Sequence, residues 1–94
     1  MGMSSRDKEL YRRIDEVAHY VWDPIGVSDT PYARDEYQSY VPQLFTHVKN
    51  GDLTAVLDYM KWVVTDRMEI SYDQARAQRA AALMLEWKKA IDGP

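Results

Sequence analysis

The fold class of this chain follows most directly from residues 53–68, which read LTAVLDYMKWVVTDRM. Apolar side chains recur there every three or four positions, and at about 100° per residue they fall within an arc of about 140°. They are Leu53, Val56, Leu57, Met60, Val63, Val64 and Met68. The β-branched residues favour a strand weakly, but the spacing and the length of the pattern favour a helix. We therefore expect an amphipathic helix over about residues 53–68.

A second helix is expected immediately before this one, because both of its ends carry recognisable signals. It begins at Pro31, since proline suits the first helical position, and Asn50-Gly51 is typical of a helix C-terminus. Asp52 then caps the helix over residues 53–68. Pro42 lies in the middle of the pattern and cannot donate a helical hydrogen bond. The sequence therefore predicts a second helix that is kinked or broken at Pro42.

Two more helices are expected towards the ends of the chain. The first covers about residues 6–21, carries its apolar side chains on one stripe and has Ser4 or Ser5 as its N-cap. The last covers about residues 72–91, is rich in alanine and starts at a capping box with Ser71 as the N-cap. Together the four segments predict an all-α fold, a compact bundle of about four helices.

Length and composition indicate one domain. The chain has 94 residues, of which 46% are hydrophobic, and this share excludes disorder of the whole chain. We expect a single helical domain over residues 1–94, with residues 1–5 disordered. No apolar run approaches the roughly 20 residues that span a bilayer, so no membrane contact is expected. The N-terminus lacks the apolar region of a signal peptide, which predicts a cytoplasmic location.

Charge and motifs exclude several classes of function. The formal net charge is −3, and no segment carries more than one unit of excess positive charge, so binding to nucleic acid is not expected. The absence of cysteine excludes disulfides and thiolate metal sites. The sequence has no Gly-rich phosphate loop, zinc-binding helix motif or nucleophile elbow. We therefore predict a protein that is not an enzyme and needs no cofactor or metal.

A candidate loop site follows the first helix, at Trp22-Asp23-Pro24-Ile25-Gly26. Asp, Pro and Gly at the first, second and fourth positions are typical of a type I turn. One interpretation is a loop that presents the Asp23 carboxylate and the Trp22 ring to a ligand. The other, which we favour, is a helix stop in which Asp23 bonds nearby amides and Trp22 packs under the turn. The site residues would be Trp22, Asp23, Pro24 and Gly26, joined by Asp35, Tyr37 and Tyr40.

The same residues resemble a known family. The loop at residues 22–26, followed by Asp35-Glu36-Tyr37 and then Tyr40 and Pro42, is similar to a motif of small uncharacterised bacterial domains. Those domains have a tryptophan–aspartate–proline–isoleucine–glycine loop followed by an aspartate–glutamate–tyrosine helix. The resemblance covers roughly residues 10–50 and implies an all-helical fold with no assigned activity. Residues 51–94 match no family pattern.

The two histidines are candidates for a metal site. His19 lies about 180° from Leu10 on the helix, so we expect it to be exposed, away from the core. With Asp15 one turn earlier and Asp23 just beyond the helix, it could bind a divalent metal. The favoured interpretation is an exposed Asp15–His19 pair at i,i+4 spacing. His47 complements the dipole at a helix C-terminus. No metal site is therefore predicted.

Aromatic residues on the third helix are candidates for an interaction surface. Tyr59 and Trp62 lie opposite the apolar stripe, one turn apart, between Asp58 and Asp66. One alternative is that the N-terminal residues or the Trp22 loop fold over the two rings. The other, weighed equally, is that the rings are exposed and bind a partner, since such aromatics are favoured at interface centres.

The last helix is apolar around much of its circumference, and Trp87 is its candidate interaction residue. A helix of this kind is either central to the bundle or shared with a second chain. We favour the central position slightly, because it needs no partner.

The sequence thus supports two hypotheses of function. The first is a small cytoplasmic protein-interaction module that forms a homodimer or caps a partner protein. A role like that of immunity proteins or antitoxins belongs here by analogy of size and charge alone. The alternative is a small-ligand or metal-binding domain that uses the loop at residues 22–26 with Asp35, Tyr37 and Tyr40. Neither hypothesis involves nucleic acid or a membrane.

Overall fold

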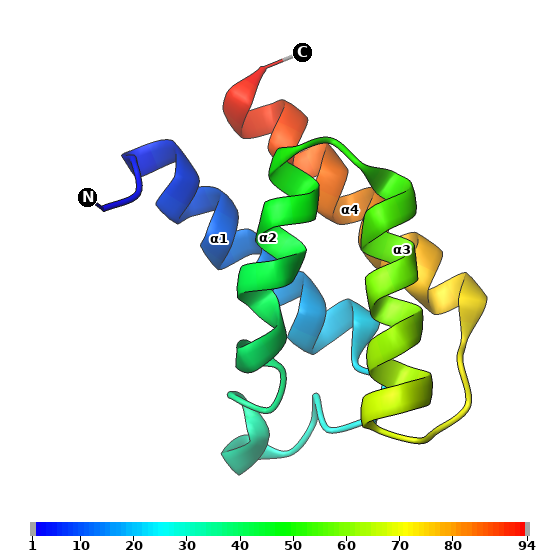
Figure 1. The fold of residues 1–94 in the computed structure, drawn as a ribbon. Coiled ribbons are helices and arrows are strands. Elements are labelled where there is room, and N and C mark those ends of the chain that lie inside the picture. Colours follow the sequence, from blue (N-terminus) through cyan, green and yellow to red (C-terminus); the bar gives the residue numbers. More distant parts are fainter. Residues whose placement is uncertain (1, 94) are drawn as a thin grey trace.

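The computed structural model describes residues 2–93, and this part of the chain is all-α and contains no strand. Its four α-helices are α1 (Ser5–Val17), α2 (Val41–Lys49), α3 (Leu53–Trp62) and α4 (Gln74–Asp92). In Figure 1, α2 and α3 run antiparallel at the front of the molecule, and α1 and α4 pass behind them. Both α1 and α3 pack against α2 and against α4. The predicted all-α bundle of about four helices is confirmed.

The core lies between these two layers and is built from the apolar stripes of all four helices. It consists of Leu10, Ile14, Val17, Ala18, Trp22, Tyr37, Val41, Leu44, Val48, Val56, Met60, Val63, Val64, Ala77, Ala80, Ala81 and Met84. Alanine at three of the four buried α4 positions lets that helix approach its neighbours closely, since no long side chain separates the backbones. One face of α4 is therefore part of the bundle core.

Two helices end in a wider, π-helical turn. The turn η1 (Ala18–Trp22) follows α1, and the turn η4 (Val63–Arg67) follows α3. Hydrogen bonds across five residues close both turns, from the Asp23 amide to the Ala18 carbonyl (3.0 Å) and from the Met68 amide to the Val63 carbonyl (2.9 Å). Each helix together with its turn matches the helical span predicted from the sequence to within one residue at either end.

The second helix is broken, as predicted, but the regular part begins later than predicted. Residues 31–40 form two short 3₁₀ turns, η2 (Pro31–Ala33) and η3 (Gln38–Tyr40), and α2 begins only at Val41. Pro42 lies in the first turn of α2, where its missing N–H needs no helical partner. The second helix is bent by 24°. The helix predicted from Pro31 is therefore limited to two short 3₁₀ turns before Val41.

Helix α1 begins one residue earlier than predicted. The Ser4 hydroxyl accepts a hydrogen bond from the Asp7 amide (3.1 Å), and Ser5 is the first residue of α1. This cap satisfies a free amide of the first turn, so the helix begins inside the segment expected to be disordered. Met1 lies outside the described residues.

The start of α4 also differs from the prediction. Asp73, and not Ser71, is the N-cap, since its carboxylate accepts a hydrogen bond from the Arg76 amide (3.0 Å). Aspartate caps a helix as well as serine does, so both Ser71 and Asp73 are suitable N-caps, and α4 begins after Asp73. Before it, Glu69 adopts a left-handed conformation (φ 55°) in the connection from η4 to α4.

A cluster of ion pairs joins three helices at one end of the bundle. The Lys49 ammonium lies 2.8 Å from a carboxylate oxygen of Asp7 on α1 and 2.7 Å from one of Asp92 on α4. Because the groups are partly exposed, the cluster adds little stability, but it fixes the last turn of α2 against the two helices behind it.

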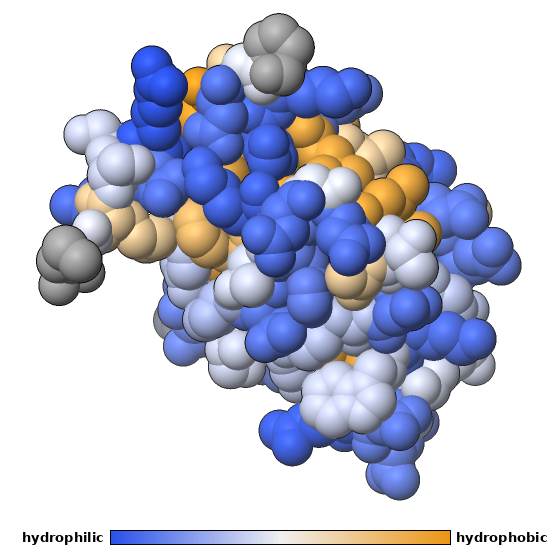
Figure 2. Space-filling view, turned by 45° about the horizontal axis from the view of Figure 1, so that its top comes forward, coloured by the Kyte–Doolittle hydropathy of each residue, from blue (hydrophilic) through white to orange (hydrophobic). Residues whose placement is uncertain are grey.

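The surface of the bundle is mainly hydrophilic. Figure 2 shows one face on which charged and polar side chains predominate, with hydrophobic side chains in small groups between them. No helix within residues 2–93 is long and apolar enough to cross a membrane. Three exposed aromatic residues stand out, namely Tyr32 (95% exposed), Tyr20 (59%) and Trp62 (47%). A single exposed aromatic is ordinary, so the contacts of each ring carry the information.

Candidate functional site

The buried carboxylate of Asp23 organises the loop after α1. Asp23 adopts a left-handed conformation (φ 35°, ψ 59°) and is only 6% exposed. Its Oδ1 accepts hydrogen bonds from the amides of Gly26 (3.1 Å) and Val27 (2.8 Å), and its Oδ2 accepts one from the amide of Ser28 (3.1 Å). The predicted turn also has its backbone bond, from the Gly26 amide to the Asp23 carbonyl (3.1 Å). One side chain thus holds three successive amides.

Tyr37 connects this loop to the segment before α2. Its hydroxyl donates to Oδ1 of Asp23 (2.7 Å) and accepts from the amide of Ile25 (3.0 Å). The tyrosine is 1% exposed, and its ring lies 5.9 Å from the ring of Trp22, which is also buried. The side chain of Tyr37 therefore closes residues 31–40 over the end of the first helix.

The pKa values of Asp23 and Tyr37 both depend on the hydrogen bond between them and on their burial. Burial by itself would raise the pKa of Asp23, but the hydrogen bonds from Tyr37 and from the amides of Val27 and Ser28 outweigh it and hold that pKa below its ordinary value. Burial, together with the hydrogen bond to the Asp23 carboxylate, raises the pKa of Tyr37. Both groups are thereby stabilised in the forms that the hydrogen bond requires, an ionised acid and a neutral phenol.

The Asp23 carboxylate is occupied by the protein itself. Its four hydrogen bonds correspond to the favoured interpretation of the sequence, a helix stop in which Asp23 bonds nearby amides and Trp22 packs beneath the turn. Gly26 suits this loop because its backbone is left-handed (φ 82°).

The remaining loop candidates lie at different distances from this centre. Tyr40 is half-buried and its ring meets that of Trp22 edge-on, with centroids 6.4 Å apart. Asp35 is exposed, and its carboxylate forms no hydrogen bond or ion pair with residues 2–93. The fold therefore brings Tyr40 towards the loop and leaves Asp35 outside it.

The expected exposure of His19 is wrong. His19 is 2% exposed and lies between two tyrosine rings, 4.5 Å from that of Tyr20 and 6.3 Å from that of Tyr37. The segment carrying Tyr37 covers this side of the helix, which the helical periodicity alone could not reveal. The Nδ1 atom of His19 has no hydrogen-bond partner within the described chain.

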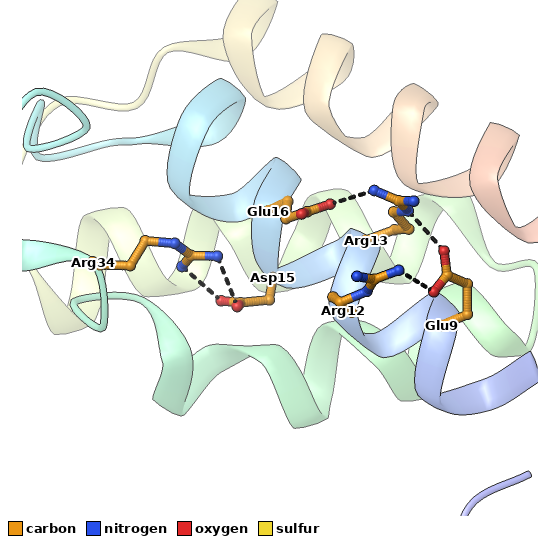
Figure 3. A network of polar contacts seen from close by, with 6 residues as sticks. All are labelled: Glu9, Arg12, Arg13, Asp15, Glu16 and Arg34. Atoms are coloured by element: carbon orange, nitrogen blue, oxygen red, sulfur yellow. Dashed lines mark hydrogen bonds and ion pairs between the residues drawn. The ribbon is translucent and has the colours of Figure 1, made fainter. Parts of the chain in front are cut away.

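Asp15 also has a different partner from the predicted one. Figure 3 shows the Arg34 guanidinium beside the Asp15 carboxylate, to which it donates two hydrogen bonds of 3.3 and 3.0 Å. The predicted Asp15–His19 pair is therefore replaced by an ion pair to residues 31–40. Among the residues that the structure describes, no three His, Asp or Glu side chains are grouped so that they could hold a metal ion.

Arg13 fixes the position of Trp87. In Figure 3, the guanidinium of Arg13 bridges Glu9 and Glu16 along α1. The same group lies over the ring of Trp87 on α4, 4.5 Å from its centroid. Trp87 is thus half-buried beside α1, and not beside the other candidate interaction residues on α3.

Those other candidates form a surface that we call the α3 aromatic face, defined as Asp58, Tyr59, Trp62 and Asp66. The ring of Trp62 stacks on that of Tyr59, with centroids 6.0 Å apart and planes inclined by 22°. Tyr59 is half-buried, and on another side its ring lies 6.0 Å from the ring of His47 on α2. Asp58 and Asp66 are exposed, and neither belongs to an ion pair in the described structure.

Sequence reasoning missed a small pocket beside the loop. It has a volume of about 90 Å³ and is lined by Trp22, Pro24, Val64, Ser71, Tyr72, Asp73 and Arg76. Arg76 donates a hydrogen bond to the backbone carbonyl of Asp23 (3.3 Å), which ties the start of α4 to the loop. Two residues of the pocket lining, Trp22 and Pro24, belong to the predicted loop site. The connection over residues 69–73 places the others, and its path carries no periodic signal in the sequence.

Comparisons with known proteins add no relatives. No family model, no curated protein and no solved structure matches the chain. The resemblance to a bacterial helical family therefore stays a prediction.

The loop geometry predicts the effect of removing one hydroxyl. Tyr37→Phe deletes the donor to Asp23 and the acceptor for the Ile25 amide, so the free energy of unfolding should fall by about 1–3 kcal/mol. Urea denaturation followed by circular dichroism measures this loss. Tyr32→Phe is the matched control, because Tyr32 is 95% exposed and should lose almost nothing. Equal stabilities of the two variants would contradict the role of Tyr37.

Proposed function

We propose that this chain is a non-enzymatic cytoplasmic protein-interaction module that binds a partner protein through the α3 aromatic face. The observation that carries the proposal is the exposed indole of Trp62, stacked on Tyr59 on the side of α3 away from the core. The apolar side of the helix is already used, since Val56 and Met60 are fully buried. Tyr59 is half-buried and packs against that core, whereas the ring of Trp62 lies outside it.

The stack makes Trp62 a good binding residue. Tryptophan and tyrosine are enriched among the residues that carry most of the energy of protein interfaces. A ring that is already held against Tyr59 loses little conformational entropy on binding, so more of its contact energy contributes to affinity. A partner that covered the indole would bury its exposed half without rearranging α3.

Charge indicates the chemistry of the partner. The exposed carboxylates of Asp58 and Asp66 lie four residues to either side of Trp62, and the chain as a whole has a net charge of −3. A Lys or Arg side chain of a partner could lie over the indole and also pair with these carboxylates. We therefore propose a partner with a basic contact surface. A role like that of immunity proteins or antitoxins fits such a partner by analogy of size and charge.

The test compares three forms of the chain as bait. Proteins retained by the unchanged chain, by Trp62→Asp and by Tyr32→Asp are quantified by mass spectrometry, and a retained protein is purified for calorimetry. We expect Trp62→Asp to weaken its binding about thirtyfold or more, since such residues contribute about 2 kcal/mol or more. The affinity should also fall as the salt concentration rises.

Tyr32→Asp is the matched control, because it makes the same exchange at an aromatic residue outside the α3 aromatic face. Circular dichroism confirms that both variants fold. A purified partner that binds Trp62→Asp as tightly as the unchanged chain contradicts the proposal, and so does retention that never depends on Trp62.

A second candidate function is the binding of a small carboxylate in the pocket beside Trp22. The guanidinium of Arg76 in the pocket favours the binding of a carboxylate. Arg76 makes one weak hydrogen bond to the backbone carbonyl of Asp23 and has further N–H groups to donate. Hydroxyls of Ser71 and Tyr72 also line the pocket, while Trp22 and Val64 supply apolar walls. The small volume of about 90 Å³ limits a ligand to a few heavy atoms.

Propionate is the probe for this second function. Titration into the ¹⁵N-labelled protein should shift the indole signal of Trp22, and Arg76→Gln should weaken binding about tenfold, the worth of a charge-assisted hydrogen bond. Arg12→Gln removes the same charge from an exposed position and should bind normally. Binding of propanamide as tight as that of propionate would exclude a carboxylate site, as would unchanged binding by Arg76→Gln.

A further inference from the structure

The outer surface of α4 carries an open groove beside the residues that pack against the core. Leu83, Glu86, Trp87 and Ala90 line it, and its volume is about 300 Å³. The groove belongs to a continuous strip that we call the α4 outer face, within about 100° of arc on the helix. Its members, all exposed or half-buried, are Ala75, Arg79, Ala82, Leu83, Glu86 and Ala90. The side chains are small or apolar apart from two charges.

Those two charges are opposite in sign and have no partners in their own chain. Neither Arg79 nor Glu86 forms an ion pair or a side-chain hydrogen bond with any residue from 2 to 93. They are seven positions apart in the sequence, so they lie on the same side of α4, about 10 Å apart along its axis. At that distance they cannot pair with each other within one helix.

A second copy of the helix would satisfy both charges. We propose that two copies of this chain pack α4 against α4 in antiparallel orientation, with the two-fold axis passing between Ala82 and Leu83. Arg79 then faces Glu86 of the partner subunit, and the symmetry repeats the pair on the other side of the axis. Two ion pairs then form, each between an Arg79 and a Glu86 that have no partner within their own chain.

The same register fills the groove. Ala90 meets Ala75 of the partner subunit, and Leu83 meets Ala82 of the partner subunit, so the N-terminal half of one helix lies on the groove of the other. Small side chains on the facing half let the two backbones approach closely. Trp87 lies at the rim, where Arg13 already covers one side of its ring. A parallel pairing would instead place like charges opposite each other, which is unfavourable.

This contact is separate from the α3 aromatic face and goes beyond the proposed function. The two surfaces share no residue, so each can be removed without the other. Loss of the dimer on its own would leave the binding of a basic partner at Trp62 in place.

Charge reversal tests the register directly. Sedimentation velocity of the unchanged chain should give twice its mass of 11.0 kDa at high concentration. Arg79→Glu places a glutamate opposite Glu86 and should weaken the dimer about tenfold or more, and Glu86→Arg should do the same. The double variant Arg79→Glu/Glu86→Arg restores opposite charges and should recover the dimer. Lys8→Glu is the control, because it makes the same charge change at an exposed residue of α1.

Circular dichroism establishes that every variant is folded. A mass of 11.0 kDa for the unchanged chain at all concentrations overturns the proposal. Single and double variants that are equally weak overturn the antiparallel register. A dimer that is lost with Trp62→Asp and kept with Arg79→Glu would place the second copy on α3 and also overturns it.

Discussion

The buried hydrogen bond between Asp23 and Tyr37 is the constraint on which the arrangement of the first half of the chain depends. The Asp23 carboxylate stops the first helix by holding the amides of residues 26–28, and Tyr37 brings residues 31–40 back over the same point. That segment covers His19 and places the Arg34 guanidinium where it pairs with the Asp15 carboxylate. The entry of α2 into the bundle therefore follows from one carboxylate and one phenol.

Much of the helical framework could be predicted from the sequence, because it depends on local signals. The apolar period of residues 53–68, the cap at Asp52 and the break at Pro42 each act within a few residues. The burial of His19 and the pocket at Arg76 could not be predicted, since both depend on irregular connections that pack from elsewhere. The helical wheel placed Trp62 opposite the apolar stripe but left open whether another segment covers its ring, and its stacking on Tyr59 also needed coordinates.

The two proposed surfaces have a common physical origin. A bundle of four short helices buries one face of each helix and has too little chain to cover the opposite faces. On α3 the uncovered side presents an aromatic stack between acids, which suits a basic partner. On α4 it presents small side chains with one charge of each sign, which suits a second copy. This difference in chemistry is the basis for proposing a partner protein at α3 and a second copy of the chain at α4.

The most direct test of the central constraint is the pH dependence of stability in the unchanged chain and in Asp23→Asn. The native pKa of Asp23 is lowered from 3.8, so its stabilisation is complete above that value and is lost as the pH falls through the native pKa. At pH 7 the unchanged chain should be more stable by about 1–3 kcal/mol, and the difference should narrow in acid. A difference that is absent at pH 7, or that does not change with pH, would contradict the account.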